Sequence, residues 1–173
     1  MPASSAPSRR SPATGLLLGG LLAVAGCATH SYGPGDLKPG ASRADVLARL
    51  GPPAMSATLA DGGERIDFWR GPYGKHTWRV ELDATGRVRR VAQILNESNF
   101  EALPLGAGRA DVLARLGPPS EQRVGWRGVG QVWSYRYESV WCRWFQVWLV
   151  DDLVREASYG TDPICDDTLR KDD

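Results

Sequence analysis

The sequence contains few of the residues and motifs on which catalytic and metal sites depend. Only two histidines occur among 173 residues, and neither lies in a metal-binding or catalytic sequence pattern, since His30 falls in the predicted tether and His76 opens a predicted strand beside Lys75. There is no Walker loop, Gly-x-Ser-x-Gly elbow, His-Glu-x-x-His or Cys-x-x-Cys motif. The glycine-rich stretch 125–130 lies between two predicted strands, which indicates a hairpin turn and not a phosphate cradle. We therefore expect a non-enzymatic protein with no catalytic residues, cofactor, metal or small-molecule substrate.

An excess of charge of one sign and further long hydrophobic runs are also absent. Removal of residues 1–26 would leave 19 basic and 20 acidic residues, a formal charge near minus one, so nothing favours a nucleic-acid partner. After residue 26 no run of 18 apolar residues occurs, and we expect the mature body to be soluble. Its length suffices for one ordinary domain or two small ones.

The first 26 residues have the pattern of an export signal. Arg9 and Arg10 precede an apolar stretch that is too short to span a bilayer, and small residues end it directly before Cys27. This arrangement is typical of a lipobox, where the cysteine is acylated and becomes the new N-terminus; an ordinary secretory signal is the alternative. We predict a palmitate-bearing lipoprotein anchored through Cys27. Because Ala28 and not aspartate follows, we expect the periplasmic face of the outer membrane.

The cysteine count indicates one disulfide. Apart from Cys27 the chain contains only Cys142 and Cys165, and an oxidising compartment favours their pairing over two free buried thiols. Closing a loop of this length stabilises a fold by about 3 kcal/mol.

An internal repeat covers most of the mature chain. Residues 40–53 recur as residues 106–119 with a single difference, Ser42 against Gly108. Keeping the offset of 66 aligns Ile66 with Val132, and one residue of slip after that strand aligns Trp78 with Phe145. Each copy predicts a short helix, because its apolar residues share one face, followed by a firm stop at Gly-Pro-Pro.

Four short β-rich stretches separated by turn residues follow each helix. They are residues 54–59, 64–70, 76–83 and 87–95 in the first copy, and 121–127, 131–138, 142–150 and 153–159 in the second. Residues 96–103 predict an additional helical turn. The pattern predicts an α+β fold of two tandem repeats, each a short helix or helix pair packed on a four-stranded antiparallel sheet.

These elements divide the chain into five parts. We expect a signal peptide at 1–26, a flexible tether at 27–37, repeats at 38–95 and 96–165, and a charged tail at 166–173.

Tryptophans in the second repeat replace charged residues of the first. In the aligned third strands, alternate positions hold Arg79 and Glu81 in one copy but Trp144 and Trp148 in the other. A solvent-facing tryptophan cluster on a sheet is typical of protein recognition. We predict a protein-binding face formed by Trp133, Trp141, Trp144 and Trp148. The alternative is that these rings cover the junction between the repeats or pack under the tail.

The helix motif resembles that of the SmpA/OmlA family of small outer-membrane lipoproteins, also called BamE-like. Asp45–Pro52 and Asp111–Pro118 carry the resemblance, with Asn99-Phe100-Glu101 resembling the first helix of that family's unit. In its tandem form the chain is similar in plan to the β-lactamase inhibitor protein fold, which implies a continuous concave sheet. The family resemblance implies an accessory role in outer-membrane β-barrel assembly or envelope integrity, with assembly components as partners.

Three functions remain open on these residues. The first is a lipid-anchored module that binds an envelope protein, and the second is an inhibitor of a periplasmic or secreted enzyme. The third is an enzyme that uses carboxylate pairs, with Glu97 and Glu101 or Asp151 and Asp152 as candidates, although such pairs are commonly surface charges.

Overall fold

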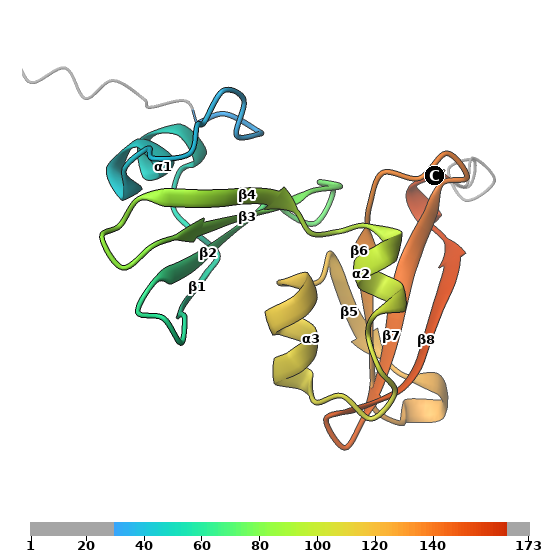
Figure 1. Ribbon diagram of the computed structural model, residues 1–173. Coiled ribbons are helices and arrows are strands. Elements are labelled where there is room, and N and C mark those ends of the chain that lie inside the picture. The colour runs from blue at the N-terminus through green and yellow to red at the C-terminus, as the bar shows by residue number, and fades with distance from the viewer. Residues whose placement is uncertain (1–29, 166–173) are drawn as a thin grey trace, which may run out of the picture.

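The computed structural model describes residues 30–165 and consists of two similar units (Figure 1). The predicted signal peptide, the acylation site Cys27 and the charged tail 166–173 lie outside the described residues.

The first unit contains one helix and one sheet. Helix α1 (Arg43–Leu50) precedes β1 (Met55–Thr58), β2 (Glu64–Trp69), β3 (Thr77–Leu82) and β4 (Val88–Gln93). The strands form sheet 1 in the order β1-β2-β3-β4, with every neighbouring pair antiparallel.

The second unit repeats this plan with one helix more. Helices α2 (Glu97–Glu101) and α3 (Arg109–Leu116) precede β5 (Glu121–Val124), β6 (Gln131–Arg136), β7 (Arg143–Val150) and β8 (Leu153–Thr161). These strands form the antiparallel sheet 2 in the order β5-β6-β7-β8, and short 3-10 turns lie at Trp126–Gly128 and Pro163–Cys165. The structure confirms the predicted fold class, and each strand begins and ends within three residues of its prediction.

The two repeated helices begin in slightly different ways. In α1 the Ser42 side chain accepts a hydrogen bond from the backbone of Asp45, whose carboxylate accepts one in return from the Ser42 backbone at 2.9 Å. Helix α3 has Gly108 at this position, so only the return bond from its backbone to Asp111 remains, at 3.0 Å. The single difference within the repeated segment thus removes both hydrogen bonds of the Ser42 hydroxyl, the one from the Asp45 backbone and the one to the Asp45 carboxylate.

Each helix packs on one face of its own sheet and builds a separate core. In the first unit Val46 and Leu50 of α1 are buried among side chains of β2 and β3, such as Ile66 and Val80. In the second unit Val112 and Leu116 of α3 take the equivalent places, and Phe100 of α2 stacks on Phe145 at 4.4 Å between ring centroids.

The burial pattern corrects the alignment of the two repeats. Ile66 and Trp133 occupy equivalent core positions, as do Phe68 and Tyr135, so the offset is already 67 in the second strand. The extra residue lies in the β5–β6 connection, which contains the 3-10 turn Trp126–Gly128. The predicted pairing of Ile66 with Val132 was therefore wrong by one residue, which exchanges the two faces of a strand.

The units are stacked in the order α1, sheet 1, α3, sheet 2. Figure 1 shows α3 between the two sheets. The sheets are separate and four-stranded, so the continuous sheet implied by the inhibitor-like plan is not formed. Each sheet thus has an inner face on its own helix and an outer face on the opposite side.

Residues 30–37 make specific contacts, although a flexible tether was expected there. The backbone of Ser31 donates to the carbonyl of Arg49 at 2.8 Å, and Leu37 packs against the core of the first unit. The hydroxyl of Tyr32 lies 3.0 Å from Nδ1 of His76. The chain is therefore fixed to the first unit from Ser31 onward.

Candidate functional site: the outer face of the second sheet

The outer face of sheet 1 is covered by α3 of the second unit. Asp67 of β2 is 1% exposed, and Arg79 of β3 donates two hydrogen bonds to its carboxylate, at 2.8 and 2.7 Å. The same guanidinium and that of Arg65 donate to the carbonyl of Ala114 in α3, at 2.8 and 3.1 Å. An ion pair on sheet 1 thus holds the C-terminal half of the second unit's helix.

The outer face of sheet 2 has a neutral pair at the equivalent positions. Ser134 replaces Asp67 and Gln146 replaces Arg79, and the Gln146 amide donates to the Ser134 hydroxyl at 3.0 Å. None of the three α-helices within residues 30–165 packs on this face as α3 packs on the outer face of sheet 1. The charged pair that binds a helix in the first unit has become a neutral pair beside an open surface.

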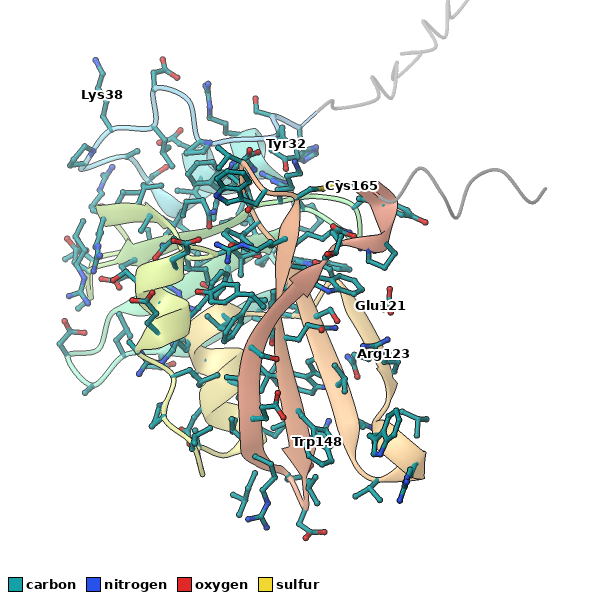
Figure 2. All side chains as sticks on the ribbon, turned by 90° about the vertical axis from the view of Figure 1, so that its right-hand side faces the viewer. Tyr32, Lys38, Glu121, Arg123, Trp148 and Cys165 are labelled. Carbon is teal, nitrogen blue, oxygen red and sulfur yellow. A yellow bond between two sulfur atoms is a disulfide. The ribbon has the colours of Figure 1, made fainter. Side chains whose placement is uncertain are left out.

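A hollow of about 420 Å³ lies on this face, in the part of sheet 2 distant from the first unit. We call it the open face, and Figure 2 shows two of its residues, Arg123 and Trp148. It is lined by Arg123, Trp126, Val132, Gln146, Trp148, Glu156 and Ser158. The lining joins apolar rings and hydrogen-bonding groups to one charge of each sign, which is a composition typical of protein-binding surfaces.

Trp148 forms the centre of the open face. Its indole Nε1 donates to the carbonyl of Val129 at 2.9 Å, which fixes the ring against the β5–β6 connection. Gly125 allows this approach, because a Cβ atom there would lie 2.6 Å from Nε1 of Trp148. The ring is preorganised and half-buried, so a partner would restrict it at little entropic cost.

Trp126 was missed by the sequence analysis. Its side chain is 74% exposed in the 3-10 turn beside Trp148. A hydrophobic residue within a glycine-rich turn was the available signal, but the stretch was interpreted only as a hairpin connection.

Trp133 and Trp144 do not face solvent, so this part of the prediction was wrong. Trp133 is 2% exposed because it lies on the inner face against α3, as the corrected alignment requires. Trp144 lies on the outer face but is 3% exposed, with the Arg136 guanidinium 5.2 Å from its ring. Both rings belong to the packed interior and offer a partner no side-chain surface.

Arg136 explains the burial of Trp144 and also joins the two units. Its Nε donates to Asp162 at 2.7 Å, and its Nη1 donates to the carbonyl of Pro72 in the first unit at 2.6 Å. The ring of Tyr73 lies 5.7 Å from the same guanidinium. A buried ion pair and the β2–β3 loop therefore cover the end of sheet 2 that holds Trp144.

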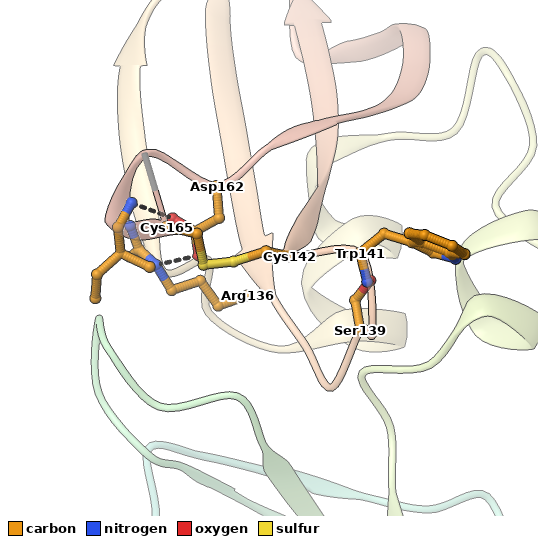
Figure 3. The surroundings of a disulfide bond; sticks show 7 residues. Arg136, Ser139, Trp141, Cys142, Asp162 and Cys165 are labelled. Atoms are coloured by element: carbon orange, nitrogen blue, oxygen red, sulfur yellow. Dashed lines mark hydrogen bonds and ion pairs between the residues drawn. A yellow bond between two sulfur atoms is a disulfide. The ribbon is translucent and has the colours of Figure 1, made fainter. Parts of the chain in front are cut away.

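Trp141 lies apart from the open face, on the β6–β7 hairpin. It is 75% exposed and directly precedes Cys142, which forms the predicted disulfide with Cys165 (Figure 3). The Cα atoms of the two cysteines are 6.2 Å apart. The disulfide is confirmed, whereas the four tryptophans do not form one cluster.

The other candidate residues have structural partners. His76 lies between Tyr32 and the stacked ring of Trp78, 5.3 Å between centroids, and its Nε2 is 3.9 Å from Glu138. Glu97 accepts from the Tyr137 hydroxyl at 3.0 Å and from Arg143 at 3.2 Å.

The remaining acidic candidates are exposed. Glu101 is at the end of α2, and Asp151 and Asp152 form the β7–β8 turn, where Asp152 pairs with Arg109 at 2.6 Å. Within residues 30–165 no group of three or more acidic, histidine or cysteine residues could hold a metal ion. The helices in this part of the chain are all too short or too polar to cross a membrane.

Several solved structures resemble this chain, among them two whose overall similarity is weak. One is a cysteine-rich secretory protein from Staphylococcus aureus, with a TM-score of 0.28 and 12% identity over 72% of this chain. This chain spans only 44% of that protein's length. The other is a "putative beta-lactamase inhibitor protein" from Streptococcus mutans, with a TM-score of 0.31 and 12% identity over 77% of this chain and 90% of that one. No family model and no curated protein matches the sequence.

Proposed function

We propose that this chain is a non-enzymatic, lipid-anchored module of the bacterial envelope that binds a protein through the open face of sheet 2. One observation carries the proposal. The outer face of sheet 1 is covered by a helix of the second unit, whereas no described residue covers the open face. Trp148 and the exposed Trp126 supply rigid apolar area there, and Arg123 and Glu156 supply one charge of each sign.

Anchoring and cellular place rest on the N-terminal sequence. A lipobox at Cys27 supports acylation and attachment to the periplasmic side of the outer membrane. The helix motif, which occurs twice in the sequence, supports membership in the SmpA/OmlA family and a partner among the β-barrel assembly components. These assignments are part of the proposal.

Site-specific crosslinking tests the proposed face. A photoreactive residue at Arg123, on the rim of the hollow, should link the chain to one envelope protein in intact cells. Trp126→Ala combined with Trp148→Ala should reduce that adduct at least tenfold, because both rings that would contact the partner are removed.

Two controls separate binding from folding. Trp141→Ala removes an equally exposed indole at a different place and should leave the adduct unchanged. An unchanged adduct in the double variant, whose circular dichroism remains that of the wild type, would contradict the proposed face. A β-barrel assembly component in the adduct would support the binding of an envelope protein. A single stoichiometric hydrolase would instead support the function of an enzyme inhibitor.

A further inference from the structure

Apart from Tyr32 in the N-terminal segment, the exposed large apolar side chains of the described residues fall into two groups, which lie at opposite ends of the second unit. One group surrounds the open face and the β7–β8 turn: Val124, Trp126, Val129, Leu153 and, in the α2–α3 connection, Leu105. The other group comprises Tyr73, Val140, Trp141 and Ile164. We call this second group the apolar tip. The β6–β7 hairpin, which carries Val140 and Trp141, lies at one end of the antiparallel strands β6 and β7, and the β5–β6 and β7–β8 connections lie at the other end. The length of these strands therefore separates the two groups.

The apolar tip is held firmly although its side chains are exposed. Val140 is 92% exposed and Trp141 75%. The turn beneath them is closed by the backbone of Cys142 donating to the carbonyl of Ser139 at 3.3 Å, and by the Cys142–Cys165 disulfide. Exposed apolar side chains on a braced turn do not serve this chain's own core, and Figure 3 shows Trp141 directed away from the disulfide.

The apolar tip lies beside the place where the N-terminal segment joins the body. Tyr32 contacts His76 at 3.0 Å, and His76 in turn lies 3.9 Å from Glu138 in the tip's own hairpin. Tyr73 belongs to the same β2–β3 loop, which Arg136 binds at Pro72. Figure 2 shows Tyr32 and Cys165 at the same end of the molecule, with Trp148 at the other end.

The chain between the anchor and this point is short. Cys27 is four residues before Ser31, whose backbone is fixed to Arg49 at 2.8 Å. Four residues extend at most about 14 Å, roughly half the hydrocarbon thickness of a bilayer. An acylated Cys27 would therefore keep the end of the molecule around Tyr32 at the membrane surface, with the apolar tip next to it.

We propose that the apolar tip rests in the headgroup region of the lipid bilayer that holds the anchor. Tryptophan and tyrosine favour this region, because their rings are apolar and their N–H or O–H groups remain hydrated. This inference rests on the acylation of Cys27 proposed above. The membrane would then lie at one end of the second unit. The open face, at the other end, would remain accessible to a protein partner on the periplasmic side.

Fluorescence quenching by lipid tests the inference. The full acylated chain is incorporated into vesicles of phosphatidylethanolamine and phosphatidylglycerol, with part of the lipid brominated near the top of the acyl chains. Bromine quenches only indoles at the membrane surface. We expect a quenched component in the wild type that disappears in Trp141→Phe.

Trp126→Phe is the matched control, because Trp126 is 74% exposed at the opposite end. It should retain the full quenched component. Quenching that is absent in the wild type, or that disappears with Trp126 and persists without Trp141, would overturn the inference. Flotation of the vesicles is measured separately, so a chain that does not float refutes the anchor, whereas one that floats unquenched refutes only the tip.

Discussion

Exchange of Arg79 for glutamine tests how much the buried ion pair with Asp67 contributes to the free energy of unfolding. Asp67 is 1% exposed, and Arg79 supplies both hydrogen bonds to its carboxylate. Breaking a buried pair by removing one partner costs about 3–5 kcal/mol, since an uncompensated charge remains. Arg65 still lies 4.0 Å from that carboxylate, so we expect the lower end, about 3 kcal/mol.

The assay is urea unfolding near neutral pH, followed by circular dichroism. With a denaturant dependence of about 2 kcal/mol per molar urea, Arg79→Gln should lower the unfolding midpoint by about 1.5 M. The second unit supplies the control, because it holds Ser134 and Gln146 at these two positions with a 3.0 Å hydrogen bond.

The double variant Asp67→Ser with Arg79→Gln recreates that neutral pair in sheet 1. It should unfold within about 1 kcal/mol of the wild type, because no uncompensated carboxylate is left in the interior and Arg65 keeps its hydrogen bond to the carbonyl of Ala114. A double variant as unstable as Arg79→Gln alone would refute the reasoning. The loss would then come from the missing bond to the carbonyl of Ala114 and not from the stranded carboxylate.

Three other perturbations test the disulfide, the tryptophan assignment and the surface ion pairs. Replacing Cys142 and Cys165 together by serine should cost about 3 kcal/mol in urea unfolding, and added reductant should not lower the stability of that variant further. Trp144→Ala should cost about 3–5 kcal/mol, because its ring is buried, and should lower the melting temperature far more than Trp148→Ala. The hydrogen bond from Arg43 lowers the pKa of Glu64 below its ordinary value of 4.5. A lowered pKa gives stability that is present above the unfolded-state value and lost as the pH falls through the folded-state value. Urea midpoints should therefore decrease below about pH 4.5, and less steeply in Arg43→Gln.

The helices and strands were predictable from the sequence, because the residues that determine where each begins and ends are close together in the chain. A capping serine with Asp45 three residues on, and a glycine before two prolines, determine where α1 begins and ends. The disulfide followed from counting cysteines, since the predicted acylation of Cys27 would leave only two to pair.

The arrangement of side chains on the second sheet was not predictable from the repeat. One additional residue in the β5–β6 connection moves Trp133 from the outer face to the inner face, and only the strand pairing reveals where it lies. The contacts of Arg136 and Tyr32 join segments that are distant in sequence, so no local pattern announces them. Trp144 was assigned to the correct face, but its burial depends on Arg136.

The repeat also accounts for the chemistry of the open face. In a stack of such units each outer face contacts the helix of the next unit, and the final unit has no successor within the described chain. An arginine like Arg79 is held in place by a carboxylate and by a helix carbonyl. Without the helix, the guanidinium would lose this carbonyl acceptor, while the position of the carboxylate would stay closed to solvent, since Ser134 there is 0% exposed. A buried charge that lacks one of its partners is costly, whereas a neutral hydrogen-bonded pair leaves no such charge. The substitution of Ser134 and Gln146 for the pair, with Trp148 beside them, is therefore what we expect of a face adapted to a partner other than its own repeat.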